Sequence, residues 1–276
     1  MAKTRRLISE NLKNVDAVIE LLDARIPYSS QNPEIRKLCA NKPSIILLNK
    51  ASLADPAVTR AFAAHFSNEN TVCIETDCIS GHGLSKIAPA IRELCGEKLA
   101  RYEEKGMIGR SLKAMVVGIP NVGKSSLINK ISGNKKAKVE NRPGVTLNKQ
   151  WVGTDIGIML LDMPGVLWPK FEDQTAAVKL AFTGAISDDI LDIETLAMML
   201  LTYLAESYPQ TLAERYKLEL SGGESGLELL EAVGKKRGMI ISGGEINCER
   251  AAITVLDEFR SGKLGRVTLE MPPVRE

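Results

Sequence analysis

Short apolar runs alternate with amphipathic, helix-like segments over about the first 165 residues of the chain. The apolar runs are rich in Val, Ile and Leu and are separated by segments with the period of a helix, as in a sheet buried on both faces. The pattern therefore predicts an α/β fold with a mostly parallel sheet and helices on both faces. The expected strands are 17–23, 44–49, 71–76, 113–119 and a pair, 151–154 and 156–161, that turns at Thr154-Asp155. The expected helices are 34–41, 56–66, 83–101 and one that opens at Ser125.

Strand signals fade after Phe171, and helical periodicity dominates the rest of the sequence. Amphipathic patterns predict helices at 173–185, 190–207, 225–236 and 248–261. The sequence thus predicts two domains, residues 1–172 with the sheet and residues 173–276 as a small all-helical domain.

Composition adds a charge asymmetry to this picture. The chain has 276 residues, 44% of them hydrophobic, which is enough for a proper core. Residues 1–170 carry a net charge of about +9 and residues 171–276 about −7. A basic half favours nucleic acid as a partner, although a solvated basic face is the common alternative. The five cysteines have no zinc-site spacing, and the absence of a long apolar run or a signal sequence argues against export and membrane insertion.

The segment Gly118–Ser125 matches the phosphate-loop pattern G-x-x-x-x-G-K-[ST]. It lies between an apolar strand and a helix, so backbone N–H groups and the helix N-terminus would face an anion. Lys124 would reach the β- and γ-phosphates, and the Ser125 hydroxyl would hold Mg²⁺. The alternative, a glycine-rich turn with a chance lysine, lacks this strand and helix context. The expected nucleotide contacts in this loop are Asn121, Val122, Gly123, Lys124, Ser125 and Ser126.

Two further segments supply candidate metal and phosphate contacts. Asp162 ends an apolar strand and suits Mg²⁺ through water, while the Gly165 amide can meet a γ-phosphate. Thr146, in Arg142-Pro-Gly-Val-Thr146, can add a hydroxyl to Mg²⁺, or it can simply be a strand residue after a Pro-Gly turn.

Asn49-Lys50 ends a predicted strand about seventy residues before the phosphate loop. In an ordinary GTPase the base-reading Asn-Lys follows the phosphate loop, so the order here is inverted. Lys50 can lie along a base and Asn49 can support the loop. The inversion predicts a circularly permuted P-loop GTPase domain.

Together these segments resemble the circularly permuted GTPases of the ribosome-biogenesis GTPase A family, over nearly the whole chain. The resemblance implies GTP and GDP as ligands with Mg²⁺, and hydrolysis coupled to late assembly of the large ribosomal subunit. It also implies a helical C-terminal domain that contacts rRNA, and catalytic roles for Lys124, Thr146 and Gly165. The segments that carry it are Leu22–Pro27 with Ser30, Asn32 and Pro33, then Leu47–Lys50, Gly118–Ser125, Arg142–Thr146, Asp162–Lys170 and Lys236–Gly238.

The chain departs from the family pattern near the base. The family motif is Asn-Lys-x-Asp, whose aspartate pairs with guanine N1 and N2, but the fourth position here is Ser52. Asp55 is a candidate substitute. The fifth motif falls near Thr76-Asp77-Cys78 and matches poorly, with Cys78 as the expected nucleotide contact. The family's aromatic-Pro-Gly-His segment would precede Met1.

The residues after the third motif also bear on hydrolysis. Ras-like enzymes use a glutamine there to orient water, whereas Val166 and Leu167 cannot form a side-chain hydrogen bond. Another group, a cation or a partner must then orient the water. Asn121 is the candidate ligand for K⁺, with a loop-shaping role as its alternative.

We therefore expect a cytoplasmic GTP-binding and GTP-hydrolysing switch whose slow turnover is stimulated by its partner, the large ribosomal subunit with its rRNA. We expect a monomer away from the ribosome, no membrane partner, and an RNA contact at Lys235-Lys236-Arg237. The alternative is a nucleotide-gated RNA- or ribosome-binding module with little or no hydrolysis, which Ser52 and the missing histidine favour. The motif order argues against a third option, a small-metabolite kinase.

Overall fold

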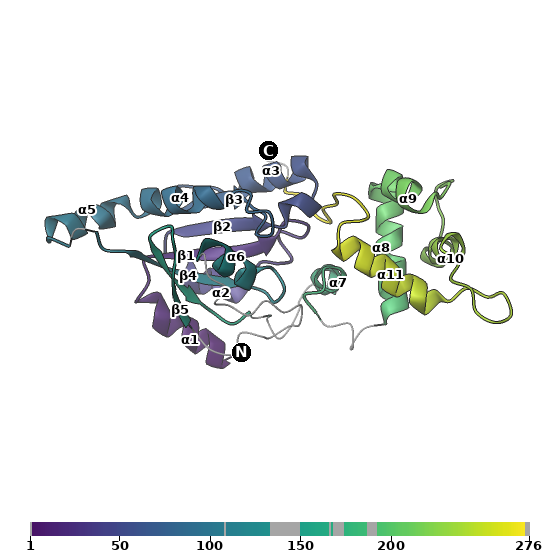
Figure 1. Cartoon of the computed structure of the whole chain (residues 1–276), viewed down its shortest axis with the longest axis horizontal. Coiled ribbons are helices and arrows are strands. Elements are labelled where there is room, and N and C mark those ends of the chain that lie inside the picture. Colours follow the sequence, from purple (N-terminus) through teal and green to yellow (C-terminus); the bar gives the residue numbers. More distant parts are fainter. Residues whose placement is uncertain are drawn as a thin grey trace. The chain divides into compact units, whose positions relative to one another are not determined.

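A computed structural model describes residues 2–107, 109–132, 150–165, 167, 174–186 and 192–273, with side chains from residue 5 onward. The chain divides into two compact units (Figure 1). Unit 1 comprises Met1–Glu172 together with Thr268–Glu276, and unit 2 comprises Asp173–Val267. The last residues therefore belong with the sheet, although the sequence pattern predicts that they are part of the helical domain.

Unit 1 is built on a six-stranded sheet in the order β3-β2-β1-β4-β6-β5. All neighbouring strands are parallel except β5, which runs antiparallel to β6 at the edge. This is the mostly parallel sheet predicted from the apolar runs. The strands are β1 Ala17–Asp23, β2 Ser44–Asn49, β3 Thr71–Glu75, β4 Leu112–Gly118, β5 Gln150–Gly153 and β6 Ile158–Asp162.

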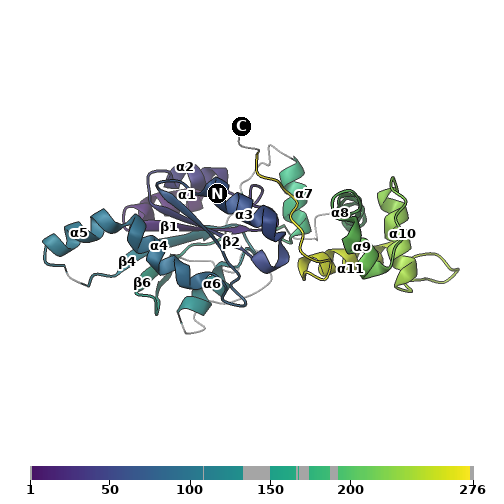
Figure 2. The same cartoon turned by 90° about the horizontal axis from the view of Figure 1, so that it is seen from above.

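Helices cover both faces of this sheet (Figure 2). One face carries α1 Ala2–Leu12, α2 Pro33–Cys39 and α3 Pro56–Phe66. Side chains of α1 and α2 form one core cluster with β1, β4 and β6, and α3 forms another with β1 and β2. The other face carries α4 Ile87–Leu94 and α6 Lys124–Ile131. Two 3₁₀ turns, η1 Ala51–Leu53 and η2 Leu84–Lys86, complete this part of the unit.

The helix expected over 83–101 is divided in the structure. After η2 and α4, the helix is interrupted at Cys95, and a second helix, α5 Gly96–Glu104, follows. None of the residues of α5 is buried. Figure 1 shows α5 extending away from the sheet. Gly96 is a weak helix former, so a break at this point is inexpensive.

Strand order places the candidate site. The chain moves from β1 to β2 and β3 on one side, then crosses back to β4 on the other side of β1. Ligands of open α/β sheets bind at the carboxyl ends of strands where the order reverses in this way. The phosphate loop follows β4 at that reversal, and the loops after β1, β2 and β6 open at the same edge.

Unit 2 is helical, and α8 is its central helix. The apolar side of α8, including Leu200 and Leu204, is fully buried, and α8 packs on both α10 and α11. The Glu258 carboxylate of α11 accepts hydrogen bonds from Arg215 and Arg237. The amphipathic periodicity of the sequence predicts four of these helices but not α9. The helices are α7 Gln174–Phe182, α8 Ile193–Ser207, α9 Pro209–Tyr216, α10 Gly226–Lys236 and α11 Cys248–Arg260.

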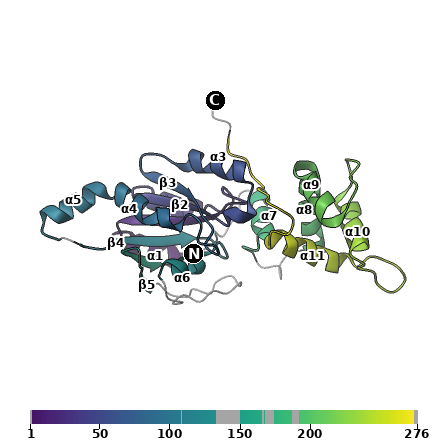
Figure 3. The ribbon, with the colours of Figure 1, turned by 45° about the horizontal axis from the view of Figure 1, so that its top comes forward.

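The C-terminal segment returns to unit 1 and is held there by hydrogen bonds (Figure 3). The Leu269 N–H donates to the Arg25 carbonyl at 2.8 Å. The Glu270 carboxylate accepts the Tyr28 N–H at 2.6 Å, the Ser29 N–H at 3.1 Å and the Ser29 hydroxyl. Because Glu270 is itself buried, these contacts anchor the segment onto the loop after β1.

Candidate functional site

The phosphate loop joins the buried strand β4 to α6 and has the backbone that an anion cradle needs. Gly118 adopts φ +150, and a Cβ there would lie 2.7 Å from the Leu21 carbonyl of β1. Gly123 adopts φ +108 at the N-cap of α6, and Asn121 is left-handed at φ 57. These turns keep the helix N-terminus open, where N–H groups and the helix dipole favour a bound phosphate.

Lys124 begins α6 and is folded back over the loop. Its ammonium donates to the carbonyls of Gly118 at 3.0 Å and Ile119 at 2.9 Å. Burial lowers the pKa of Lys124 to about 8, and the nearby Asp162 charge acts in the opposite direction. A buried cation held by neutral carbonyls would gain a stronger, charge-assisted partner in a phosphate.

Asp162 ends β6 and is buried. Its Oδ1 has no hydrogen-bond partner among the residues that the structure describes. Burial raises the pKa of Asp162 to about 6, although Lys124 lowers it. A buried carboxylate oxygen without a partner fits a hard cation such as Mg²⁺, directly or through water.

Gly165, three residues further on, lies against the phosphate loop. A Cβ at this position would be 2.7 Å from the Lys124 ammonium and 3.1 Å from the Pro120 nitrogen. A side chain at position 165 would displace the Lys124 ammonium and press on the Pro120 backbone, so the third motif and the phosphate loop form one surface.

Asn49 connects three loops of the site. Its side-chain amide donates to the Val122 carbonyl at 2.7 Å, and its Oδ1 accepts the Cys78 N–H at 3.0 Å. A Cβ on Gly123 would lie 2.3 Å from the Asn49 amide nitrogen. Asn49, at the end of β2, therefore braces the phosphate loop, which follows β2 in the sequence.

The Lys50 side chain is held by Asp23, a residue that the sequence motifs do not assign to the nucleotide site. Lys50 has a left-handed backbone at φ 58, and its ammonium is 2.9 Å from the Asp23 Oδ2. The Arg25 guanidinium bonds both oxygens of Asp23, at 2.9 and 2.8 Å. Burial alone would raise the pKa of Asp23, but Arg25 and Lys50 outweigh it and hold the pKa well below its usual range. Asp23 is thus an ionised anchor that orients Lys50.

Ser52 contacts a carboxylate, but not that of Asp55. The Ser52 hydroxyl donates to Asp77, whose other oxygen accepts the N–H groups of Ile79 at 3.0 Å and Ser80 at 2.9 Å. Asp55 instead caps α3 through bonds to the amides of residues 57 and 58. The idea that Asp55 replaces the missing aspartate therefore does not fit the structure.

The expected residues for which the structure gives positions are brought to the carboxyl edge of the sheet. Ser125 and Ser126 are half-buried in the first turn of α6. Thr146, Val166 and Trp168–Lys170 lie outside the described residues. The residues at this edge are Asn49, Lys50, Ser52, Cys78, Asn121, Val122, Gly123, Lys124, Ser125, Ser126, Asp162 and Gly165.

Among the described helices, none is long and apolar enough to cross a membrane.

Comparisons with known proteins agree with this geometry. A family model described as a 50S ribosome-binding GTPase matches residues 113–218. A "Ribosome biogenesis GTPase A" from Bacillus licheniformis is 45% identical over 99% of this chain and 96% of its own length. A "Mitochondrial ribosome-associated GTPase 1" from Xenopus tropicalis is 33% identical over 98% of this chain and 92% of its own length.

Two solved structures share the fold. GDP-bound TM YlqF has a TM-score of 0.68 at 25% identity and covers 97% of this chain and 99% of its own. GNP-bound YlqF from T. maritima has a TM-score of 0.64 at 26% identity, with 98% of each chain covered.

Proposed function

This chain belongs to the ribosome biogenesis GTPase A family, and from that premise we propose that its site binds GTP with the residues assembled at the carboxyl edge of the sheet. It is a P-loop GTPase with a role in ribosome assembly. The observation that carries the assignment of the site is the contact of three separate motifs. Asn49 braces Val122, and Gly165 lies against Lys124.

Replacement of Lys124 tests this assignment. Lys124→Ala removes the buried ammonium that would meet the β- and γ-phosphates, so GTP affinity should fall by at least about a hundredfold. The measurement is a titration with Mg²⁺-GTP, with Lys86→Ala, an exposed lysine, as the matched control. Equal GTP affinity in Lys124→Ala and the control would refute the site.

We assign Mg²⁺ to Ser125 and Asp162, with Thr146 as a third ligand from the sequence. The unsatisfied Oδ1 of Asp162 supports this assignment. The ion would neutralise charge on the phosphate oxygens. For K⁺ we assign Asn121, whose left-handed backbone shapes the loop where a monovalent cation would lie near the phosphates.

Slow intrinsic hydrolysis follows from the residues after the third motif. Leu167 cannot orient a water molecule, and the sequence has valine at position 166. We propose that a partner completes the water-binding site, and that this partner is the large ribosomal subunit. The names of the relatives support this choice. Turnover measured with and without large subunits tests it: stimulation is expected, and the same slow rate in both would favour the binding-module alternative.

Two of the three basic residues expected to contact RNA in unit 2 remain candidates. Lys235 and Lys236 end α10 and are exposed, but the Arg237 guanidinium lies 2.9 Å from Glu258. We therefore propose Lys235 and Lys236 as the RNA-facing charges. We also propose that the protein is cytoplasmic and that it is a monomer away from the ribosome.

A further inference from the structure

The recognition of the base by Ser52 and Asp77 rests on the proposed GTP site. Ser52 is exposed near Lys50, whereas Asp77, to which it is hydrogen-bonded, is a buried residue with 6% exposure. The Ser52 hydroxyl donates its proton to Asp77. A hydroxyl has one proton and two lone pairs, so this bond leaves Ser52 able only to accept on its outer side.

Because its outer side can only accept a hydrogen bond, the Ser52 hydroxyl discriminates between guanine and adenine. Guanine presents N–H donors at N1 and N2, whereas adenine presents an unprotonated nitrogen at N1. We propose that Ser52 accepts the guanine N–H groups and that Asp77 is the positioning residue that fixes the hydroxyl and supplies negative charge behind it. The pair would replace the single aspartate of the Asn-Lys-x-Asp pattern.

The position of the pair supports this role. The Asn49 Oδ1 accepts a hydrogen bond from the N–H of Cys78, the residue after Asp77. The Asn49 amide nitrogen donates to the Val122 carbonyl in the phosphate loop. The loop that holds Asp77 is therefore attached to the same residue as the phosphate site. Asp77 also accepts two backbone N–H groups, so its carboxylate is held in place without a ligand.

Asp77→Asn separates this role from a structural one. The asparagine oxygen can still accept the Ile79 and Ser80 amides, but its NH₂ donates to Ser52 and frees the hydroxyl to donate to adenine. The GTP-to-ATP affinity ratio should fall by about tenfold or more. Ser52→Asp alone brings two carboxylates together and should also bind GTP poorly. The double variant Ser52→Asp/Asp77→Asn restores one carboxylate and should recover the preference.

The readouts are dissociation constants for GTP and ATP, with thermal melting to check folding. An unchanged ratio in Asp77→Asn would overturn the proposal, as would a double variant no better than Ser52→Asp. Failure of the GTP site itself would look different, because wild-type protein and the exposed-lysine control Lys86→Ala would then bind neither nucleotide.

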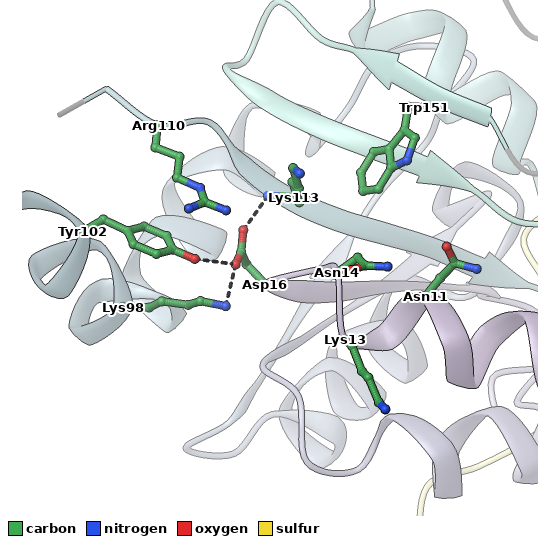
Figure 4. A pocket seen from close by; sticks show the side chains of 9 residues that line it. All are labelled: Asn11, Lys13, Asn14, Asp16, Lys98, Tyr102, Arg110, Lys113 and Trp151. Atoms are coloured by element: carbon green, nitrogen blue, oxygen red, sulfur yellow. Dashed lines mark hydrogen bonds and ion pairs between the residues drawn. The ribbon is translucent and has the colours of Figure 1, made fainter. Parts of the chain in front are cut away.

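A second, independent observation is a basic pocket at the amino-terminal ends of β1 and β4 (Figure 4). Its volume is about 400 Å³. Asp16 is the one acidic residue in its described lining, and it is already bound by the Lys98 ammonium at 2.5 Å and the Lys113 N–H at 2.8 Å. The full lining is Asn11, Lys13, Asn14, Asp16, Lys98, Tyr102, Arg110, Lys113 and Trp151.

Aromatic rings lie among these cations. The Arg110 guanidinium is 4.5 Å from the centre of the Tyr102 ring, and the Lys113 ammonium is 5.3 Å from that of Trp151. Trp151, on the edge strand β5, is 39% exposed. Excess positive charge beside an exposed ring is the combination that holds single-stranded nucleic acid, because phosphates meet the cations and a base stacks on the ring.

We infer that this pocket binds single-stranded RNA, with Trp151 as the stacking platform and Lys13, Arg110 and Lys113 on the phosphates. The pocket belongs to unit 1, whereas Lys235 and Lys236 belong to unit 2. The probe is a fluorescent 12-nucleotide oligouridine titrated into the full chain. Lys13→Ala/Arg110→Ala should weaken binding about tenfold or more and reduce the salt slope by about 1.4. Lys37→Ala/Lys86→Ala, with the same charge change at exposed sites, should not.

Trp151 separates RNA from a simple anion. Trp151→Ala should weaken oligouridine binding about tenfold, while Trp151→Phe keeps most of it. If Lys13→Ala/Arg110→Ala and Lys37→Ala/Lys86→Ala weakened binding equally, the assignment of RNA to this pocket would be overturned. Unchanged binding in Trp151→Ala, with inorganic polyphosphate competing as well as RNA, would overturn the RNA assignment. Neither result depends on GTP turnover, so a failure here leaves the proposed GTP site standing.

Discussion

Raising the pH from 7 to 9 should weaken GTP binding, because the unliganded protein loses the Lys124 proton in this range. Burial lowers the pKa of Lys124 to about 8. The ammonium form, which binds phosphate, then falls from about nine-tenths of the protein at pH 7 to about one-tenth at pH 9. Since apparent affinity scales with the competent fraction, the dissociation constant should rise about tenfold.

Lys124 affects the folding stability of the unliganded protein in the opposite direction as the pH rises. In the unfolded chain a lysine keeps its proton to about pH 10.4, so between about pH 8 and 10 the unfolded state binds more protons than the folded one. Stability of the unliganded protein should therefore gain from this group as the pH rises, while affinity for GTP falls. Opposite trends in melting temperature and affinity would identify a buried lysine rather than general loss of structure.

The assay is calorimetric titration of GTP at pH 7, 8 and 9, at constant ionic strength and with EDTA to remove Mg²⁺. Asp162→Asn is the matched variant. The Asp162 charge raises the pKa of Lys124, so its removal should move the midpoint to lower pH. A GTP affinity that does not change with pH, or a midpoint that stays the same in Asp162→Asn, would refute the reasoning.

Substitutions at Gly123, Asn121 and Glu270 test three other parts of the structure. Gly123→Ala should cost about 1–3 kcal/mol of stability and most GTP affinity, because φ is +108 and the Cβ would meet the Asn49 amide at 2.3 Å. Gly109→Ala, at φ +76 with no described atom within 4 Å of the added Cβ, is the control, and equal losses in chemical denaturation would contradict the clash. GTP hydrolysis should be faster in K⁺ than in Na⁺, and Asn121→Ala should remove the difference. Identical wild-type rates in the two salts would contradict the assignment of K⁺ to Asn121. Glu270→Ala should destabilise unit 1 by about 1–3 kcal/mol, since the Tyr28 and Ser29 N–H groups lose their acceptor. Urea unfolding against Glu245→Ala, an exposed glutamate, measures this, and matching midpoints would contradict it.

Much of the sheet could be predicted because each strand is a local signal. Apolar runs such as 44–49 are buried along nearly their whole length, and their ends agree with the structure. Helix α1 was missed because Leu7, Ile8 and Leu12 are too few apolar positions among charged ones to make a clear stripe. Cys95 was read as helical because one residue with a slightly altered backbone leaves the periodicity almost unchanged.

The site was predictable where a motif is contiguous and not where it depends on folding. Lys124 and Ser125 follow from the phosphate-loop pattern alone. The bond between Ser52 and Asp77 joins residues 25 apart, and its significance depends on which carboxylate the folded chain brings to Ser52. Proximity in sequence favoured Asp55, but that side chain is taken up by the N-terminus of α3.

The return of residues 268–273 to unit 1 changes what kind of module the helical unit is. A domain appended at one end can be removed by a single cut, but Asp173–Val267 is continuous with unit 1 at both of its ends. In topological terms it is an insertion. Deleting the chain from residue 173 onward would also remove Glu270 and its bonds to the loop after β1. A deletion that spares unit 1 must excise the helices and rejoin the two ends.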